Sequence, residues 1–330
     1  MASRGSRLLK LTGAIAGGAT ALAYTAYRKD IKAARQRIQA DRQVIQSAHG
    51  PIEFAESGDG PSVLVVHGAG GGFDQGLDLA RVFLGDNHRV IAPSRFGYLG
   101  TPLPADASAE AQADAHLRVL DALQLTRVPV IAVSAGAPSA MQLCLKHPER
   151  CSALVLIVPM AFTPKRAPAR APSRFFEVVL NAIAASDLLF WAATKVARST
   201  LLKTILGTPP EHYRNGTPDE RRSVDEMLRS ILPISRRSAG IWNDSVISSN
   251  LTRYELEDIQ APTLVISAAD DLYGTYESSL YTSEQIDHGK FLAFPTGGHL
   301  LLGHDAEVRS HVASFLNECL GPEKRTAMAS

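Results

Sequence analysis

Short apolar runs alternate with segments of helical periodicity over much of the chain. Five runs have the length and composition of β-strands, at residues 52–56, 62–66, 89–92, 128–133 and 151–158. The last is almost continuously apolar, as expected for a strand covered on both faces. Helices are predicted at 77–84 and 108–125, and after residue 134, where Pro138 suits a first helical turn. Strands that alternate with helices in this way predict an α/β fold with a doubly wound, mostly parallel sheet.

The alternation stops after Pro159. Residues 161 to about 259 are helix-like, and the strand pattern resumes at 263–267 and 291–294. We therefore expect an α/β core over 51–160 and 260–321, interrupted by a helical insertion over 161–259. One stretch of this insertion is apolar around much of the helix circumference, which predicts burial or the lining of an apolar pocket. Its apolar residues are Phe175, Phe176, Val178, Val179, Leu180, Ile183, Leu188, Leu189, Phe190 and Trp191.

The first fifty residues follow a different pattern. Arg4, Arg7 and Lys10 precede an uncharged run over 11–27, rich in Ala, Gly and Thr and near the lower length limit for crossing a bilayer. We interpret this run as an anchor or targeting segment that associates the protein with a membrane. A cleaved signal peptide, an organellar targeting sequence and a frayed terminal helix remain open alternatives.

The segment after this run is basic and amphipathic. Six basic residues over 28–42 outnumber the three before residue 11, which favours a cytoplasmic location for the rest of the chain if the run is a membrane anchor. Apolar residues at Ile31, Ala34, Ile38 and Ile45 predict an amphipathic connecting helix over 30–47. Residues 1–50 therefore form the predicted anchor and linker region.

Charge and cysteine content exclude several classes of function. The 330 residues include 34 basic and 33 acidic side chains, so the balance gives no reason to expect nucleic acid as a partner. Three scattered cysteines are too few for a disulfide framework or a metal cluster. We expect neither a metal nor a cofactor.

Ser134 is the most informative candidate for chemistry. It lies in Ala132-Val133-Ser134-Ala135-Gly136, where an apolar strand meets a predicted helix. Small residues two positions before and after a serine allow a sharp strand-to-helix turn that exposes its hydroxyl. The usual motif has glycine at the first small position, where this chain has Ala132. The pattern alone is weak, because small-x-Ser-x-small occurs often by chance.

Three further signals fall in a consistent order around this serine. A strand runs into the glycine-rich segment 67–72, another ends in Asp270 and Asp271, and a third ends in Gly297-Gly298-His299. Along the chain these features follow the order glycine loop, serine, acid and histidine. In this order of features, residues 52–320 resemble the α/β-hydrolase superfamily. The resemblance implies a Ser-His-Asp triad and makes the helical insertion a cap over the site. A few apolar residues of that cap would then form the wall for an acyl group.

The resemblance also implies a role for each candidate residue. His299 is the predicted base, preferred to His304, which we place on the first turn of the terminal helix. Asp271, the last residue of a stretch resembling the family's acid motif, is preferred to Asp270 as the carboxylate that orients His299.

The backbone N–H groups of Ala135 and of Ala69, with Gly70 as the alternative to Ala69, would form the oxyanion hole. A phosphate-binding reading of the glycine run at 70–72 is disfavoured because no Lys-Ser/Thr follows it. His67 is predicted to be structural.

Together these features predict a serine hydrolase that cleaves a small-molecule carboxylic ester, with an apolar acyl group, through an acyl-enzyme. A serine nucleophile disfavours the epoxide hydrolase and haloalkane dehalogenase branches, which depend on an alkyl-enzyme ester. Carbon–carbon bond hydrolysis and acyl transfer by the same triad remain alternatives, as does a catalytically silent binding protein.

Overall fold

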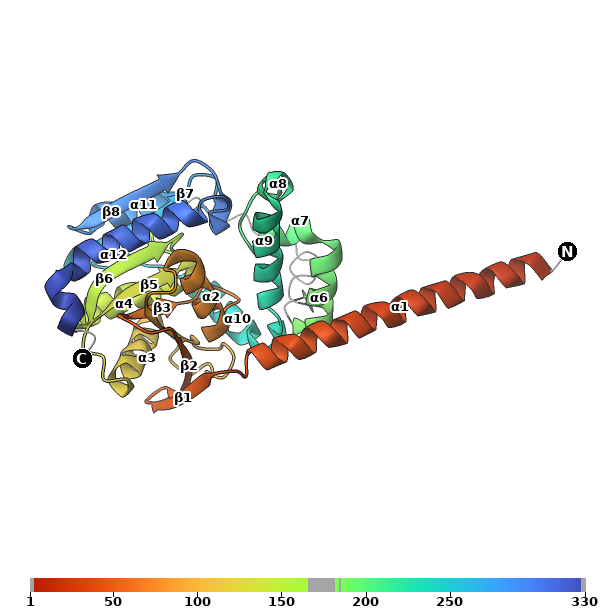
Figure 1. Ribbon diagram of the computed structural model, residues 1–330, viewed down its shortest axis with the longest axis horizontal. Helices are drawn as coiled ribbons and strands as arrows, with labels where there is room; N and C mark the ends of the chain where they lie inside the picture. Colours follow the sequence, from red (N-terminus) through yellow and green to blue (C-terminus); the bar gives the residue numbers. More distant parts are fainter. Residues whose placement is uncertain (1–2, 166–181, 184, 328–330) are drawn as a thin grey trace.

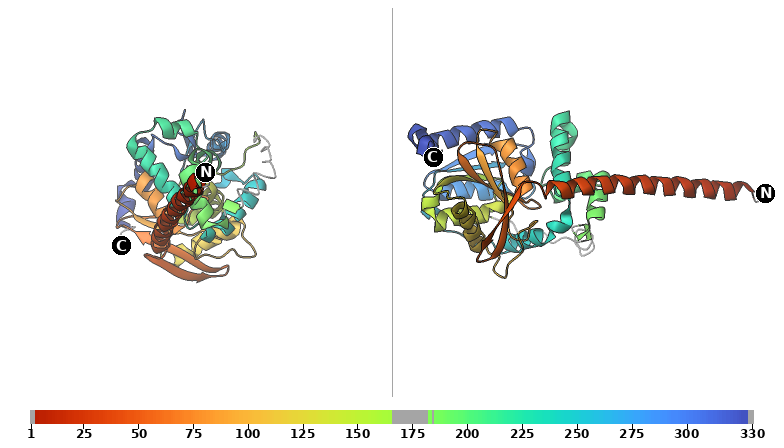
Figure 2. Two further views of the ribbon diagram at one scale, coloured as in Figure 1. Left: turned by 90° about the vertical axis from the view of Figure 1, so that its right-hand side faces the viewer. Right: turned by 60° about the horizontal axis from the view of Figure 1, so that its bottom comes forward.

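An eight-stranded sheet forms the centre of the molecule. The computed structural model describes residues 3–165, 182–183 and 185–327 (Figures 1 and 2). The strands are β1 (Arg42–Ser47), β2 (Gly50–Ser57), β3 (Ser62–Val66), β4 (Arg89–Pro93), β5 (Val128–Val133), β6 (Cys151–Ile157), β7 (Thr263–Ala268) and β8 (Gly289–Phe294). Their order is β1-β2-β4-β3-β5-β6-β7-β8. Only the pairings of β2 with β1 and β4 are antiparallel. The predicted doubly wound, mostly parallel sheet is confirmed.

Helices cover both faces of this sheet. One face carries α2 (Phe73–Phe83) and α12 (Asp305–Ala327), and the other carries α3 (Ala109–Ala122), α4 (Ala137–Lys146) and α11 (Thr275–Gln285). Each face has its own cluster of buried apolar side chains, because successive residues of a strand point to opposite faces. Leu64 thus lies in one cluster and Val65 in the other. The helix predicted over 77–84 begins earlier, at Phe73, whose side chain is also buried.

The insertion between β6 and β7 contains five described helices beyond the carboxyl ends of the parallel strands (Figure 1). They are α6 (Asp187–Val196), α7 (Arg198–Thr204), α8 (Pro210–Asn215), α9 (Pro218–Ser230) and α10 (Ser238–Ser249). We refer to the insertion, with the segments that connect these helices, as the cap. The apolar residues predicted over 175–180 lie outside the described residues. Phe190 and Trp191 are buried in a third apolar cluster, whereas Leu188 and Leu189 are exposed.

The amino-terminal helix α1 (Ser3–Arg37) extends away from the rest of the molecule (Figures 1 and 2). Its carboxyl-terminal part packs against the cap, where Ile31 and Ala34 join the same cluster as Phe190. The connecting helix predicted over 30–47 is wrong beyond Arg37, because residues 42–47 form β1. There Ile45 packs against the core while Val44 is exposed, which is the two-residue alternation of a strand.

The predicted anchor over 11–27 lies within α1. The described residues contain no helix whose length and apolarity together would allow it to span a bilayer. The small and polar residues of this run keep its apolarity low despite the length of the helix.

Candidate active site

Ser134 lies at a strained turn between β5 and α4. Its φ angle is +51°, a left-handed conformation that is uncommon for a residue with a side chain. The following glycine makes the turn compatible with close packing, since a Cβ at Gly136 would lie 2.7 Å from the carbonyl oxygen of His67. The local sequence therefore lifts the Ser134 hydroxyl above the carboxyl edge of the sheet, as the small-residue pattern predicts.

His299 lies on the short helical turn Gly298–Leu300 that follows β8. The Ser134 Oγ lies 2.8 Å from His299 Nε2, within hydrogen-bond distance of a base that can accept its proton. The side chain of His299 is only 10% exposed. The ring of Tyr273 packs edge-on against the imidazole, with 4.8 Å between the two centroids.

Asp271 follows β7 and completes the chain of contacts. Its Oδ2 accepts a hydrogen bond from His299 Nδ1 at 2.7 Å, and its side chain is fully buried. The same carboxylate accepts hydrogen bonds from the Tyr273 N–H, at 2.8 Å, and from the Thr275 hydroxyl. These two donors fix the orientation of the carboxylate, which in turn fixes the orientation of the imidazole.

The two rival candidates point elsewhere. Asp270 accepts a hydrogen bond from the Gly298 N–H at 2.8 Å, and His212 of α8 contacts its other oxygen. Asp270 thus holds the turn before His299 without touching the imidazole. His304 precedes α12, stacks near Phe294 with 4.2 Å between centroids, and lies 3.7 Å from Glu307. The structure brings Ser134, His299 and Asp271 together and leaves Asp270 and His304 outside that chain of contacts.

Hydrogen bonds of the glycine-rich loop 67–72 distinguish between Ala69 and Gly70, the two candidates for the oxyanion donor on this loop. The Gly68 N–H donates to Gln75, the Gly70 N–H donates to the Tyr98 hydroxyl, and the Gly71 N–H donates to the Gly68 carbonyl. Within the described residues, the Ala69 N–H has no hydrogen-bond acceptor. Ala135 lies in the first helical turn after β5, Ser134–Gly136, where backbone N–H groups lack an acceptor within the helix. Ala69 and Ala135 are therefore available to a substrate oxygen, whereas Gly70 is not.

His67 is a structural residue beneath the loop. The Arg95 N–H donates to its Nε2 at 2.9 Å, so its Nδ1 carries the proton and donates to the Gly68 carbonyl at 2.7 Å. Complete burial, together with the nearby Arg95 guanidinium, holds the pKa of His67 well below its usual value. The ring is therefore neutral, which this pattern of hydrogen bonds requires.

Sequence reasoning missed the charged residues of the cap that reach this loop. Asp244 of α10 pairs with Arg95, and Arg237, just before α10, pairs with Asp74. The sequence offers little signal for these pairs, because charged residues on a helix usually face solvent.

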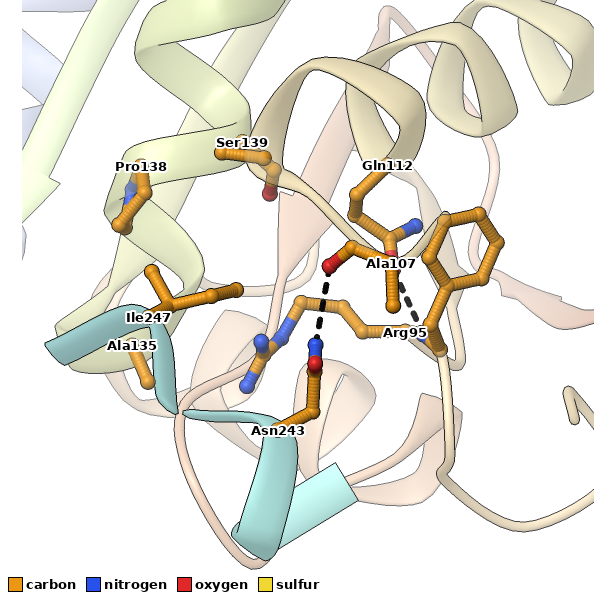
Figure 3. Close-up of a pocket in the computed structure, with 10 residues that line it drawn as sticks. Arg95, Ala107, Gln112, Ala135, Pro138, Ser139, Asn243 and Ile247 are labelled. Carbon is orange, nitrogen blue, oxygen red and sulfur yellow. Dashed lines mark hydrogen bonds between the residues drawn. The ribbon is translucent and has the colours of Figure 1, made fainter. Parts of the chain in front are cut away.

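The cap also closes tightly beside Ala135. A cavity of about 10 Å³ lies there, enough for roughly one water molecule and far too small for an ester. Figure 3 shows Asn243 of α10 at one side of this cavity and the Arg95 side chain running across it. Asn243 donates to the Ala107 carbonyl at 3.1 Å, which joins α10 to the core. In the part of the chain that the structure describes, no cluster of His, Cys, Asp or Glu side chains is suited to a metal ion.

Comparison with protein families identifies the family of this chain. The model of the alpha/beta hydrolase fold family matches residues 61–305. The chain belongs to the α/β-hydrolase family. A solved alpha/beta hydrolase fold protein from Nakamurella multipartita covers 85% of this chain with a TM-score of 0.67 and 27% sequence identity, and is itself covered completely. The protein is therefore a hydrolase of this fold.

The curated relatives of this α/β-hydrolase include proteins with named activities. It is 27% identical over 248 residues to the 2-hydroxy-6-oxo-2,4-heptadienoate hydrolase of Pseudomonas putida, a match covering 73% of this chain and 83% of that protein. It is 34% identical over 106 residues to the 2-hydroxymuconate semialdehyde hydrolase of Pseudomonas sp. (strain CF600). This second match covers 31% of this chain and only 38% of the relative's length.

Proposed function

We propose that this α/β-hydrolase cleaves carboxylic esters with apolar acyl groups, and that Ser134, His299 and Asp271 perform the reaction. The observation that carries the proposal is the continuous hydrogen-bonded chain from Ser134 Oγ through both nitrogens of His299 to Asp271. Two unoccupied backbone N–H groups lie on the loops that flank the serine, at Ala69 and Ala135. A nucleophile, its base, an orienting carboxylate and two oxyanion donors are the set that acyl transfer needs.

In this mechanism Ser134 Oγ attacks the ester carbonyl as His299 Nε2 takes the hydroxyl proton. The carbonyl oxygen becomes an oxyanion, held by the N–H groups of Ala69 and Ala135, while Asp271 stabilises the imidazolium. Collapse of the tetrahedral intermediate breaks the bond to the alcohol, which receives the proton from His299. Water then loses a proton to His299 and attacks the acyl-enzyme, releasing the acid and restoring Ser134.

The apolar character proposed for the acyl group is supported by apolar residues close to the loop and to the nucleophile. Ile231, which follows α9, lies 3.6 Å from the position that a Cβ at Gly70 would occupy. Met160 lies next to the nucleophile, since its N–H donates to the Ser134 carbonyl at 3.0 Å. An apolar group that displaces water from such surroundings contributes about 0.8 kcal/mol of binding free energy per methylene.

Carbon–carbon bond hydrolysis is the second candidate, favoured by the match to the heptadienoate hydrolase. That relative's named substrate carries a carboxylate, which calls for a cationic partner in the site. The two buried guanidinium groups nearest the glycine loop are already engaged, Arg95 by Asp244 and Arg237 by Asp74. Because neither is free to bind a substrate carboxylate, the geometry of the described residues favours an uncharged ester.

The test starts with a fluorophosphonate, which labels only an activated serine. We expect the label at Ser134 in the wild-type protein and none in Ser134→Ala. A panel of p-nitrophenyl esters of increasing acyl length should then be hydrolysed, with kcat/KM rising with length before it levels off.

Turnover of 2-hydroxy-6-oxo-2,4-heptadienoate without turnover of any ester would replace the ester proposal by carbon–carbon cleavage. A folded protein that resists labelling would instead indicate a silent binding protein.

We also propose that the amino-terminal part of α1 associates with a membrane surface. Exposed Leu22 and Tyr24 precede the exposed cations Arg28, Lys29 and Lys32 on this projecting helix. Apolar and aromatic side chains beside cations are the combination that suits the boundary between lipid headgroups and acyl chains. An enzyme held at such a surface would meet lipid-derived esters.

A further inference from the structure

The loop that carries Ala69 is held by the cap as well as by the core. The Gly70 N–H donates to the Tyr98 hydroxyl at 3.2 Å, and that hydroxyl donates to Asp244 Oδ2 at 2.5 Å. Tyr98 is fully buried, while Asp244 belongs to α10 of the cap. A chain of two hydrogen bonds therefore connects the cap to the residue next to Ala69.

Asp244 is itself fixed by a bidentate ion pair. Arg95 donates to its two oxygens at 2.6 and 2.8 Å, and the Arg95 Nε–H donates to the His67 carbonyl at 3.0 Å. Both charged side chains are about 95% buried. Buried pairs with this fork geometry are rigid, because each group would be left unpaired in a low-dielectric interior if the other moved.

A second buried ion pair holds the far side of the loop. Arg237 is fully buried, donates to the Gly71 carbonyl, and pairs with Asp74 at 2.7 Å. Burial by itself would raise the pKa of Asp74, but Arg237 and Arg37 lower it below its usual value, so the carboxylate stays ionised. Two residues of the loop thus have cap-dependent partners, Gly70 through its N–H and Gly71 through its carbonyl.

We propose that Tyr98, Asp244 and Arg237 are positioning residues that hold the Ala69 N–H in the geometry of an oxyanion donor. Gly70 adopts a φ of +73°, and the Tyr98 hydroxyl occupies its N–H, which leaves Ala69 as the donor directed to the substrate. The cap then contributes to catalysis through the backbone of the core, in addition to any contact with substrate. This inference rests on the proposed acyl-transfer function.

The deciding variant is Tyr98→Phe, which removes the hydroxyl and keeps the ring. Loss of one oxyanion donor costs about 10²–10³ in kcat, so a misplaced donor should lower kcat by about 10–100-fold, with a smaller change in KM. The informative readout is the ratio of kcat/KM for an ester to that for the matching thionoester, whose sulfur is a poor acceptor for backbone N–H groups. We expect this ratio to fall by a similar factor in Tyr98→Phe.

A matched pair of cap variants separates positioning from general loss of structure. Arg237→Ala removes the contact with Gly71. Arg236→Ala removes a neighbouring, exposed cation whose side chain, among the described residues, donates only to the Leu99 carbonyl, at 3.4 Å. The ester-to-thionoester ratio should fall in the first variant and stay at the wild-type value in the second. A folded Tyr98→Phe that keeps the wild-type ratio would overturn the proposal.

The rate of Ser134 phosphonylation tests the same point without an ester, because the phosphonyl oxygen also occupies the oxyanion hole. If wild type is labelled but hydrolyses no ester, the ester proposal fails, and slower labelling of Tyr98→Phe still supports the positioning role. Equal labelling rates would reject that role. A wild-type Ser134 that resists the label would overturn both proposals.

Discussion

Asp270 and Asp271 are adjacent in the sequence, but only Asp271 contacts the imidazole of His299. Their different hydrogen bonds predict different effects of substitution. Asp271→Asn should lower kcat for a p-nitrophenyl ester by about 10⁴, because an amide favours the wrong tautomer of His299 and cannot stabilise its cation. Asp270→Asn keeps an acceptor for the Gly298 N–H, so its kcat should fall by less than about tenfold. Steady-state kinetics of both variants tests this assignment. A larger loss of kcat in Asp270→Asn than in Asp271→Asn would reverse it.

A buried histidine away from the triad predicts how stability depends on pH. His116 on α3 is fully buried beneath α4, where its Nε2 lies 3.1 Å from Ser139 Oγ. Burial, followed by the charge of Arg95, lowers the pKa of His116 to about 3 in the folded protein. Because the unfolded state binds the proton near pH 6.5, stability is full above that pH and is lost as pH falls toward 3.

Between pH 7 and 5, His116 should account for about 2 kcal/mol of lost unfolding free energy, at roughly 1.4 kcal/mol per pH unit. Urea denaturation at both pH values should show a smaller loss for His116→Gln than for wild type. His311→Gln, at an exposed position of α12, is the control and should retain the wild-type difference. An unchanged difference in His116→Gln would show that the imidazole is not the responsible group.

At the scale of elements, α10 lies so close to the segment after β4 that position 240 of the helix has no room for a side chain. The Gly240 N–H donates to the Gly97 carbonyl at 2.9 Å, and a Cβ at Gly240 would overlap the Tyr98 ring. Gly240→Ala should therefore cost about 1–3 kcal/mol of stability by overpacking and should also lower kcat, because Tyr98 must shift.

The control for this prediction is Ala239→Gly, which changes the same helix by one methyl group at an exposed neighbour. It should cost at most about 1 kcal/mol through helix propensity and leave kcat unchanged. Circular dichroism melts and ester kinetics of both variants give the comparison. A Gly240→Ala protein with wild-type kcat would show that the loop tolerates movement of Tyr98.

The elements that could be predicted are those whose signal is local. The runs that became β3, β5 and β6 are mostly apolar segments between turn residues. Ser134 was found because it follows β5, and His299 because it follows the short apolar run 291–294 at the end of β8. β1 was missed because its short alternation lies directly after a long helical pattern. The contact of Asp244 with Arg95 joins residues 149 positions apart, and local periodicity carries no information about such a pair.

On the scale of the whole molecule, α1 has two parts with different surroundings. Residues 20–26 are exposed, whereas Ile31, Ala34 and Ile38 are buried. Trp191 donates to Asp30 at 2.8 Å, and Arg37 pairs with Asp74 at 3.1 Å. The carboxyl-terminal part of α1 is thus integral to the hydrolase, since it contacts both the cap and the helix that follows the glycine loop. The amino-terminal part contributes little to that packing.

Removal of residues 1–26 should therefore leave the melting temperature unchanged. It should also leave kcat/KM for a soluble ester within about twofold of the wild-type value. Removal of residues 1–38 deletes the buried side chains and the ion pair to Asp74, and should cost about 3–5 kcal/mol or more. Flotation with vesicles containing phosphatidylserine should recover the full chain and not the shorter deletion. That deletion keeps the cations after residue 26 but removes the exposed Leu22 and Tyr24, which would enter the boundary between headgroups and acyl chains. Equal flotation of both proteins would place the membrane-binding surface on the part of the protein after residue 26. A loss of soluble-ester activity in the shorter deletion would instead show that the projecting part of α1 is necessary for the active fold.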